Sequence, residues 1–180
     1  MNDVAWLEIA RLGIAALTPL MTLVVGVLVV HLGTKLDATK QLHAELMRKR
    51  LYLFEDIAPK LNDIFCFYQA VGHWAELNPE EVIKRKRAID RSVQVNRYLF
   101  NSDFWDEYQR FEKAHFELFA APGQPARLCL DIDHMRQRMG GYFKEEWLQA
   151  ASSKPGNHEA QRQHYQALMN TLGDEIRGAR

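Results

Sequence analysis

The longest apolar stretch of the chain is LGIAALTPLMTLVVGVLVVHL, residues 12–32, and no charged side chain lies between Arg11 and Lys35. A helix of this length rises about 31 Å, which matches the hydrocarbon core of a bilayer. A buried core helix is seldom apolar on every face over so many turns. A cleaved signal peptide has a shorter apolar region behind a basic leader, whereas the leader MNDVAWLEIAR has mixed charge. The pattern therefore predicts an uncleaved transmembrane helix over residues 12–32.

The charges on either side of this stretch predict its orientation. Residues 1–11 contain one basic side chain, that of Arg11. Five basic residues follow the stretch closely: Lys35, Lys40, Arg48, Lys49 and Arg50. Basic residues next to a span stay on the cytoplasmic side of the membrane. We therefore expect a single-pass protein of a bacterial-type inner membrane, with residues 1–11 outside and the larger C-terminal part in the cytosol.

Small side chains within the apolar stretch repeat at helical spacing. Ala15, Thr18, Thr22 and Gly26 are separated by three, four and four residues, which places them on one face of a helix. Such a face lets two helices approach closely in lipid, where there is no hydrophobic driving force for association. The spacing favours self-association of the span through this face.

Downstream of the span, apolar positions recur every three or four residues, which is the period of an amphipathic helix. Residues 33–56 are expected to form a juxtamembrane helix after a break at Gly33–Thr34, and the helix continues to about Ala75. Pro59 lies inside the apolar series, and because the series continues across it we expect a kink rather than a new helix. The series has the spacing of a bundle or coiled-coil seam and consists of Phe54, Ile57, Leu61, Ile64, Tyr68, Val71 and Ala75.

Two further helices have clear start signals. Asn78 is a capping residue followed by Pro79 and two glutamates, which predicts a helix from there to about Leu99. Asn101 or Ser102 caps the next helix. The apolar face of that helix is formed by Phe104, Tyr108, Phe111, His115 and Phe119.

The last third of the chain is divided by two loop signals, APGQP at residues 121–125 and SSKPGN at residues 152–157. The segment between them begins with alternating apolar and polar residues, but no partner strand is evident, so a helix is expected there. The final helix directs Tyr165, Leu168, Leu172 and Ile176 inward. The predicted fold class is all-α, with residues 57–180 as a cytosolic helical domain.

Composition bounds the part that follows the span. One basic and two acidic residues precede position 35, so 22 of the 23 basic and 21 of the 23 acidic residues lie at positions 35–180. This balance favours neither nucleic acid nor an acidic ligand as a partner. The two cysteines, Cys66 and Cys129, suit a reducing cytosol and exclude a disulfide scaffold.

The basic run KRKRAIDR lies on the second cytosolic helix. On a helical wheel, Lys84, Arg87 and Arg91 cluster opposite an apolar face that is formed by Val82, Ile89, Val93 and Phe100. A cationic face of this kind can contact an anionic surface. The favoured alternative is a solvated face, or pairing with the acidic helix that follows. That helix carries Asp103, Asp106, Glu107, Glu112 and Glu117.

One pattern suggests catalysis: an arginine followed after a few residues by a histidine. Two such segments occur, RFEKAH from Arg110 to His115 and RLCLDIDH from Arg127 to His134. In a helical bundle this resembles the site of HEPN-type ribonucleases, and the resemblance implies that Arg and His act on an RNA phosphodiester. The pattern allows four, five or six residues between the arginine and the histidine. With 14 arginines and 7 histidines in 180 residues, these three spacings produce about 1.6 pairs by chance. The residues after the two arginines are Phe111 and Leu128, where that family often has a polar residue.

Other chemical sites have little support in the sequence. The segment DIDH, Asp131 to His134, offers metal ligands, but no second cluster lies near it in sequence, so no metal and no cofactor are predicted. We therefore expect a non-enzymatic membrane protein whose helical bundle mediates homo-oligomerisation and recruits or senses a cytosolic protein partner. A membrane effector in a bacterial stress or phage-defence system is one form of this hypothesis, and a membrane-tethered ribonuclease is the alternative.

Overall fold

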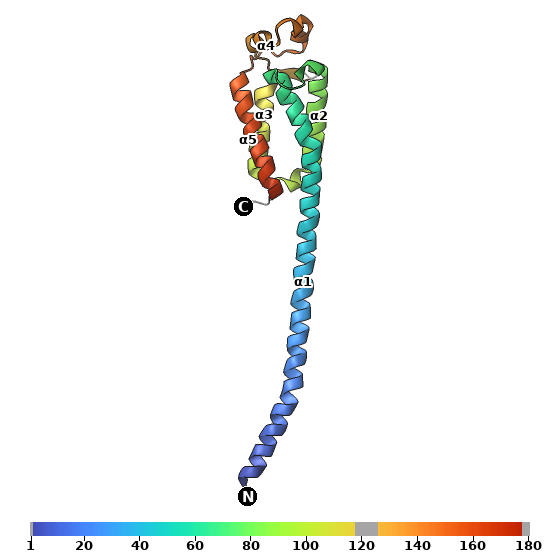
Figure 1. Ribbon diagram of the computed structural model, residues 1–180, viewed down its shortest axis with the longest axis vertical. Coiled ribbons are helices and arrows are strands. Elements are labelled where there is room, and N and C mark those ends of the chain that lie inside the picture. Colours follow the sequence, from blue (N-terminus) through green and yellow to red (C-terminus); the bar gives the residue numbers. More distant parts are fainter. Residues whose placement is uncertain (1, 118–125, 178–180) are drawn as a thin grey trace. The chain divides into compact units, whose positions relative to one another are not determined.

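The computed structural model describes the backbone of residues 2–117 and 126–177, and the side chains of these residues except at positions 2–14, 16, 18, 20 and 38 (Figure 1). The chain forms two compact units, Met1–Leu46 and Met47–Arg180. The first unit consists of the N-terminal part of helix α1. The second unit is a helical domain that contains the rest of α1 and all later elements.

Helix α1 covers Asn2–Gln69 and continues without interruption through Gly33, Thr34 and Pro59. The expected break at Gly33–Thr34 is therefore wrong. A glycine inside a helix costs only about 1 kcal/mol, and the turns on either side maintain the hydrogen-bond ladder. Pro59 lies within the helix rather than at the start of a new one, as the continuous apolar series predicted.

The C-terminus of α1 comes earlier than the predicted Ala75. Ala70 adopts a positive φ of 51°, and the N–H of Val71 donates to the carbonyl of Cys66 at 3.1 Å. This is the hydrogen-bond pattern of a Schellman motif, which ends a helix. The apolar seam is buried within the helix at Ile57, Leu61, Ile64 and Tyr68, whereas Val71 and Ala75 lie beyond its end.

Helix α2 covers Pro79–Val95 and begins as the sequence predicts. The side chain of Asn78 accepts from the N–H of Glu81 at 3.0 Å, and the Glu81 carboxylate accepts from the N–H of Asn78 at 3.1 Å. This capping box satisfies two of the amide groups that a helix leaves unpaired at its start. The helix ends at Val95, and a separate 3₁₀ turn, Arg97–Leu99, follows it.

Helix α3 covers Ser102–His115, and its cap is Asn101, whose side chain accepts from the N–H of Phe104 at 2.8 Å. The predicted apolar face is buried at four positions: Phe104, Tyr108, Phe111 and His115. Phe119 and the predicted loop 121–125 lie outside the described residues.

The expectation that the segment after Ala126 has no strand partner is wrong. Strand β2, Arg127–Leu128, pairs antiparallel with β1, Phe116–Glu117, which follows α3 directly. Strands of two residues are too short to show an alternating pattern, and their pairing depends on contacts between distant parts of the chain. The predicted helix is present further on, as α4, Ile132–Met139, followed by two 3₁₀ turns, Gly140–Tyr142 and Glu145–Ala150.

Helix α5 covers His158–Arg177 and buries Leu168 and Leu172, as predicted, while Tyr165 and Ile176 are half-buried. The loop before it contains a tight approach. A Cβ atom added to Gly156 would lie 2.1 Å from the carbonyl oxygen of Cys129, so no other residue fits there without moving the backbone.

Within the second unit, the C-terminal part of α1 packs with α2, α3 and α5 as a four-helix bundle (Figure 1). Residue numbers rise along one helix as they fall along its neighbour, so successive helices in the order α1, α2, α3 and α5 are antiparallel. Hydrogen bonds show this for each pair of neighbours: Asp63–Arg85 and Asp56–Ser92 join α1 to α2, and Asp90–Tyr108 and Lys86–Glu112 join α2 to α3. Asn101–Glu175 and Ala114–Gln161 join α3 and its cap to α5, and Arg50–Glu175 and Gln69–His158 join α1 to α5. The all-α class is confirmed.

Candidate functional site

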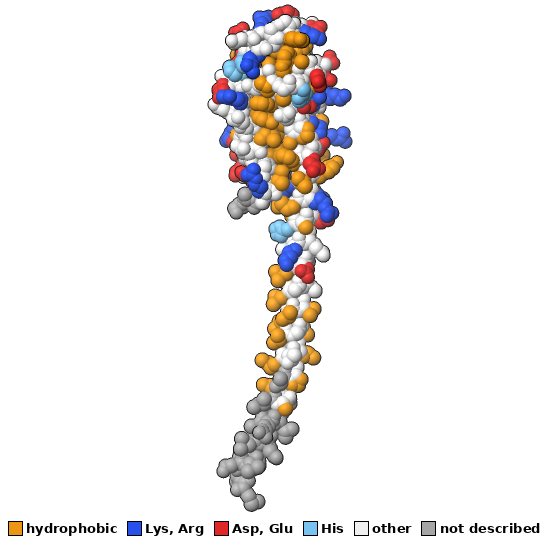
Figure 2. Space-filling model, in the orientation of Figure 1, with side chains coloured by type: hydrophobic (Ala, Val, Ile, Leu, Met, Phe, Trp, Pro, Cys, Tyr) orange, Lys and Arg blue, Asp and Glu red, His pale blue; other side chains and the backbone are white. Residues whose placement is uncertain are grey.

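The apolar part of α1 is exposed along its described length. Every residue from Met21 to Leu32 is exposed, and its large apolar side chains are between 46% and 67% accessible. Figure 2 shows hydrophobic side chains along this stretch. Among the described residues, α1 is the one helix that is long and apolar enough to cross a membrane, by length and composition. A core helix of a soluble protein also passes this test, but its side chains are mostly buried.

The predicted small-residue face is partly described. Ala15 and Gly26 are exposed, and a Cβ atom added to Gly26 would meet no atom within 4 Å. Thr22 is exposed as well, whereas the side chain of Thr18 lies outside the described set. The face therefore has room around Gly26 for a larger side chain within one copy of the protein.

The basic run on α2 divides between two environments. Lys84, Arg87 and Arg91 are exposed, and none of them forms an ion pair with a described residue. The opposite face is buried at Val82, Ile89 and Val93. The two basic residues between Lys84 and Arg87 are the ones that form ion pairs with neighbouring helices. These are Arg85, which binds Asp63 of α1, and Lys86, which binds Glu112 of α3.

Lys86 is the centre of a buried polar network that sequence reasoning did not single out. Its ammonium group lies 2.5 Å from Asp90 Oδ2 and 2.8 Å from Glu112 Oε1, and the residue is 6% exposed. The hydroxyl of Tyr108 donates to Asp90 Oδ1 at 2.5 Å. Burial raises the pKa of the Glu112 carboxyl, although the hydrogen bond from Lys86 opposes this shift. Burial also raises the pKa of Tyr108, and the charge of Asp90 adds to the effect.

The first arginine–histidine pair does not share one environment. His115 is completely buried, and burial lowers its pKa to about 3, so the ring is neutral at physiological pH. Its Nδ1 lies 2.8 Å from the carbonyl oxygen of Phe111, and its Nε2 has no partner among the described residues. Arg110 lies in solvent, where it pairs with Glu107. No described contact joins Arg110 to His115, so the structure places this histidine in the core.

The second pair is also divided between two places. Arg127 lies in β2 and lines a surface groove between α2 and the 3₁₀ turn Glu145–Ala150. His134 lies in α4, and its ring stacks on that of His158 with 3.8 Å between centroids. None of the described contacts joins Arg127 to His134. The structure instead brings together three residues that are separated in the sequence: Asp131, His134 and His158.

Asp131 organises this cluster. Its carboxylate accepts from the N–H of His134 at 3.2 Å and lies 2.8 Å from the ring Nδ1 of His158. Burial opposes ionisation of Asp131, but the hydrogen bonds from His158 and His134 outweigh burial and hold its pKa below the usual value. Burial lowers the pKa of His134, and the neighbouring His158 lowers it further. The cluster therefore joins the start of α4 to the start of α5.

The Asp131 cluster has no metal-binding geometry. Across residues 2–117 and 126–177, no group of three or more histidine, cysteine or acidic side chains is arranged to hold a metal ion. The ring of His134 is stacked face to face on that of His158, so the two rings do not converge on one point. Nothing in the sequence near DIDH predicts His158 as the neighbour, because helix α4 and two 3₁₀ turns separate them and local spacing cannot place the start of α5 beside the start of α4.

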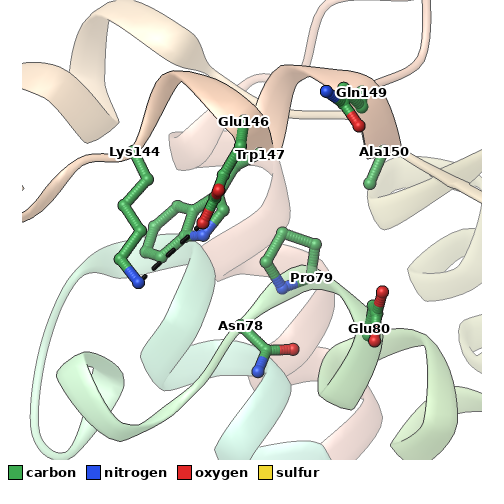
Figure 3. Close-up of a pocket in the computed structure, with 8 residues that line it drawn as sticks. All are labelled: Asn78, Pro79, Glu80, Lys144, Glu146, Trp147, Gln149 and Ala150. Carbon is green, nitrogen blue, oxygen red and sulfur yellow. Dashed lines mark ion pairs between the residues drawn. The ribbon is translucent and has the colours of Figure 1, made fainter.

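Two adjoining pockets lie on the described surface of the bundle. One has a volume of about 410 Å³ and lies between the start of α2 and the 3₁₀ turn Glu145–Ala150 (Figure 3). Figure 3 shows Asn78 and Pro79 opposite Trp147, with the ammonium of Lys144 directed toward Glu146, 3.9 Å away. The other pocket, of about 640 Å³, continues along α2 to Arg87 and Arg127. Glu80, Gln149 and Ala150 line both pockets. The second pocket is called the arginine groove below.

The chain is therefore all-α. Its C-terminal unit is a four-helix bundle, and α1, which contributes one of the four helices, is also long and apolar enough to cross a membrane. Comparison of the chain with models of protein families, with curated proteins and with solved structures gives no match.

Proposed function

We propose that this chain is a single-span membrane protein whose helical bundle is cytosolic and mediates self-association and recruitment of a protein partner. The observation that carries membrane insertion is the exposure of the apolar segment from Met21 to Leu32. Nine large apolar side chains there are exposed. On the scale that describes insertion of helices into membranes, an apolar residue at the centre contributes about 0.3–0.6 kcal/mol, so the nine together favour insertion by about 3–5 kcal/mol.

The orientation is proposed from the flanking charges. Five basic residues lie between positions 35 and 50 and one precedes the span, so the bundle stays on the cytoplasmic side of a bacterial-type inner membrane. The reducing cytosol is also consistent with Cys66 and Cys129, which are both buried free thiols.

Self-association is proposed through the small-residue face of the span. Ala15, Thr22 and Gly26 repeat at helical spacing, and the space around Gly26 is open within one copy. Two such helices gain close van der Waals packing when they meet in lipid. A partner protein would then bind to the assembled bundles, and a membrane effector in a stress or phage-defence system is the role that this architecture fits by analogy.

The test of this proposal uses the full chain expressed in bacteria with a reporter after Arg180. We expect the reporter to be active in the cytosol and the chain to resist extraction with alkaline carbonate. In a double variant, Val24→Arg with Val27→Arg, insertion should fail and the chain should be released. Each arginine at the centre of a span costs about 2.5–3.5 kcal/mol.

The matched control is Val95→Arg, which makes the same chemical change at an exposed position of the bundle. Val95 is 68% exposed, close to the 61% of Val27. The control should remain in the membrane fraction. Release of the wild-type chain by carbonate, or equal retention of the double variant, would refute membrane insertion. A reporter that is active only outside the membrane would refute the cytosolic orientation.

A further inference from the structure

The arginine groove is built from parts of the bundle that are distant in the sequence. Arg87 comes from the middle of α2, Arg127 comes from strand β2, and Gln149 comes from the 3₁₀ turn that precedes α5. The volume of about 640 Å³ lies within the range of small-molecule sites. Its walls include the apolar side chains of Ile83 and Ala126.

The guanidinium groups of Arg87 and Arg127 have no ion-pair or hydrogen-bond partner among the described residues, whereas Arg85 on the same helix pairs with Asp63. Glu80 also lines the groove, but it forms no ion pair with either of them. Most other arginines that the structure describes are engaged. Carboxylates pair with Arg50, Arg85, Arg110, Arg136, Arg162 and Arg177, and Arg97 lies over the ring of Trp105. Among the described residues, the guanidinium groups of Arg87 and Arg127 thus have no such partner, and both line one concave surface.

We propose that the arginine groove binds a small soluble molecule through a phosphate or pyrophosphate group, which Arg87 and Arg127 hold. A guanidinium group presents a planar fork of donors that matches phosphate oxygens, and charge-assisted hydrogen bonds of this kind are about twice as strong as neutral ones. Two forks from separate elements can engage two sides of one anion. The apolar wall at Ile83 accommodates the organic part, and the Gln149 amide offers a donor and an acceptor to it.

The position of the groove within the bundle favours a soluble ligand over a lipid headgroup. Asp63 pairs with Arg85, whereas Asp56 pairs with Ser92, so the first half of α2 lies beside the C-terminal end of α1. The groove is therefore near the end of the bundle that is remote from Met47, where this unit begins. The exposed Lys84 on the same helix adds a positive field that attracts anions. This inference goes beyond the proposed membrane function, and only its preference for a soluble ligand over a lipid headgroup rests on that function.

The test measures binding of inorganic pyrophosphate to the full chain in a non-ionic detergent by isothermal titration calorimetry. We expect saturable binding at one site, weakened about ten-fold or more by Arg87→Gln and by Arg127→Gln. Arg127→Lys keeps the charge but loses the fork, so its effect should be intermediate. Higher ionic strength should weaken binding to the wild-type chain.

The matched control is Arg91→Gln, one turn further along α2 and outside the groove lining. It should change the dissociation constant by less than about two-fold, because a screened surface charge contributes little. Glu80→Gln should strengthen binding, since it removes a negative charge from the groove. Circular dichroism should show that each variant remains folded. Absence of saturable binding, or equal effects of Arg91→Gln and Arg87→Gln, would overturn the proposal.

Discussion

Removal of Lys86 should expose how strongly the α2–α3 interface depends on one buried cation. In Lys86→Met, the apolar part of the side chain is kept, but two carboxylates lose the ammonium group that lies 2.5 Å from Asp90 and 2.8 Å from Glu112. Breaking a buried ion pair costs about 3–5 kcal/mol. The Asp90 side chain is 32% exposed, so solvent screens part of its charge. We expect a loss of about 3 kcal/mol in the free energy of unfolding.

The partner substitution tests whether this loss comes from an uncompensated charge. In Lys86→Met with Glu112→Gln, only Asp90 keeps a charge, and it retains the hydrogen bond from Tyr108. The double variant should lose only about 1 kcal/mol, about 2 kcal/mol less than Lys86→Met alone. If Glu112→Gln alone is neutral or destabilising, the two sites are therefore coupled by about 2 kcal/mol or more. Stability is measured by urea titration of the full chain in a non-ionic detergent, followed by tryptophan fluorescence. Additive effects of the two substitutions would refute the reasoning.

The same variants should differ in their response to pH. The pKa of Glu112 in the folded chain is raised above 4.5, because burial disfavours the carboxylate, and loss of Lys86 raises it further. A raised pKa means that the folded state keeps a proton that the unfolded state has released. The penalty of Lys86→Met is therefore full above the folded pKa of Glu112 and decreases as the pH falls toward 4.5. An equal penalty at about pH 8 and about pH 5 would contradict this account.

The remaining predictions concern three glycines. Gly26→Leu should weaken self-association in a membrane two-hybrid assay, because it fills the open space on the small-residue face. Leu23→Ala, on another face, should have little effect. Equal effects of the two substitutions would discredit the small-residue face as the contact surface. Gly156→Ala should destabilise the bundle by about 2 kcal/mol or more in a urea titration, since its Cβ would overlap the backbone of Cys129. In Gly173→Ala, the added Cβ meets only the end of the Arg177 side chain, so this control should stabilise α5 by about 0.5–1 kcal/mol. If Gly173→Ala destabilised the chain as much as Gly156→Ala, the close approach at Gly156 would not explain the loss.

The helix starts and the buried faces could be predicted from the sequence because their causes are local. Asn78 caps α2 and Asn101 caps α3 through hydrogen bonds to backbone groups three residues away. The apolar period predicts which face of each helix is buried, and this holds for Ile57 to Tyr68 of α1 and for Val82, Ile89 and Val93 of α2. The exposed cations of α2 follow from the same geometry, since they lie opposite the buried face.

Contacts between distant parts of the chain could not be predicted in this way. Within the run KRKR, the spacing does not reveal that Lys86 is the buried member, because this depends on the position of Glu112 when α3 packs against α2. The pairing of β1 with β2 and the stacking of His134 on His158 also depend on packing. Arg87 and Arg127 lie 40 positions apart in the sequence, yet they line one groove. Periodicity and capping act within a few residues, whereas these arrangements depend on which helices pack together, and only the tertiary structure decides that.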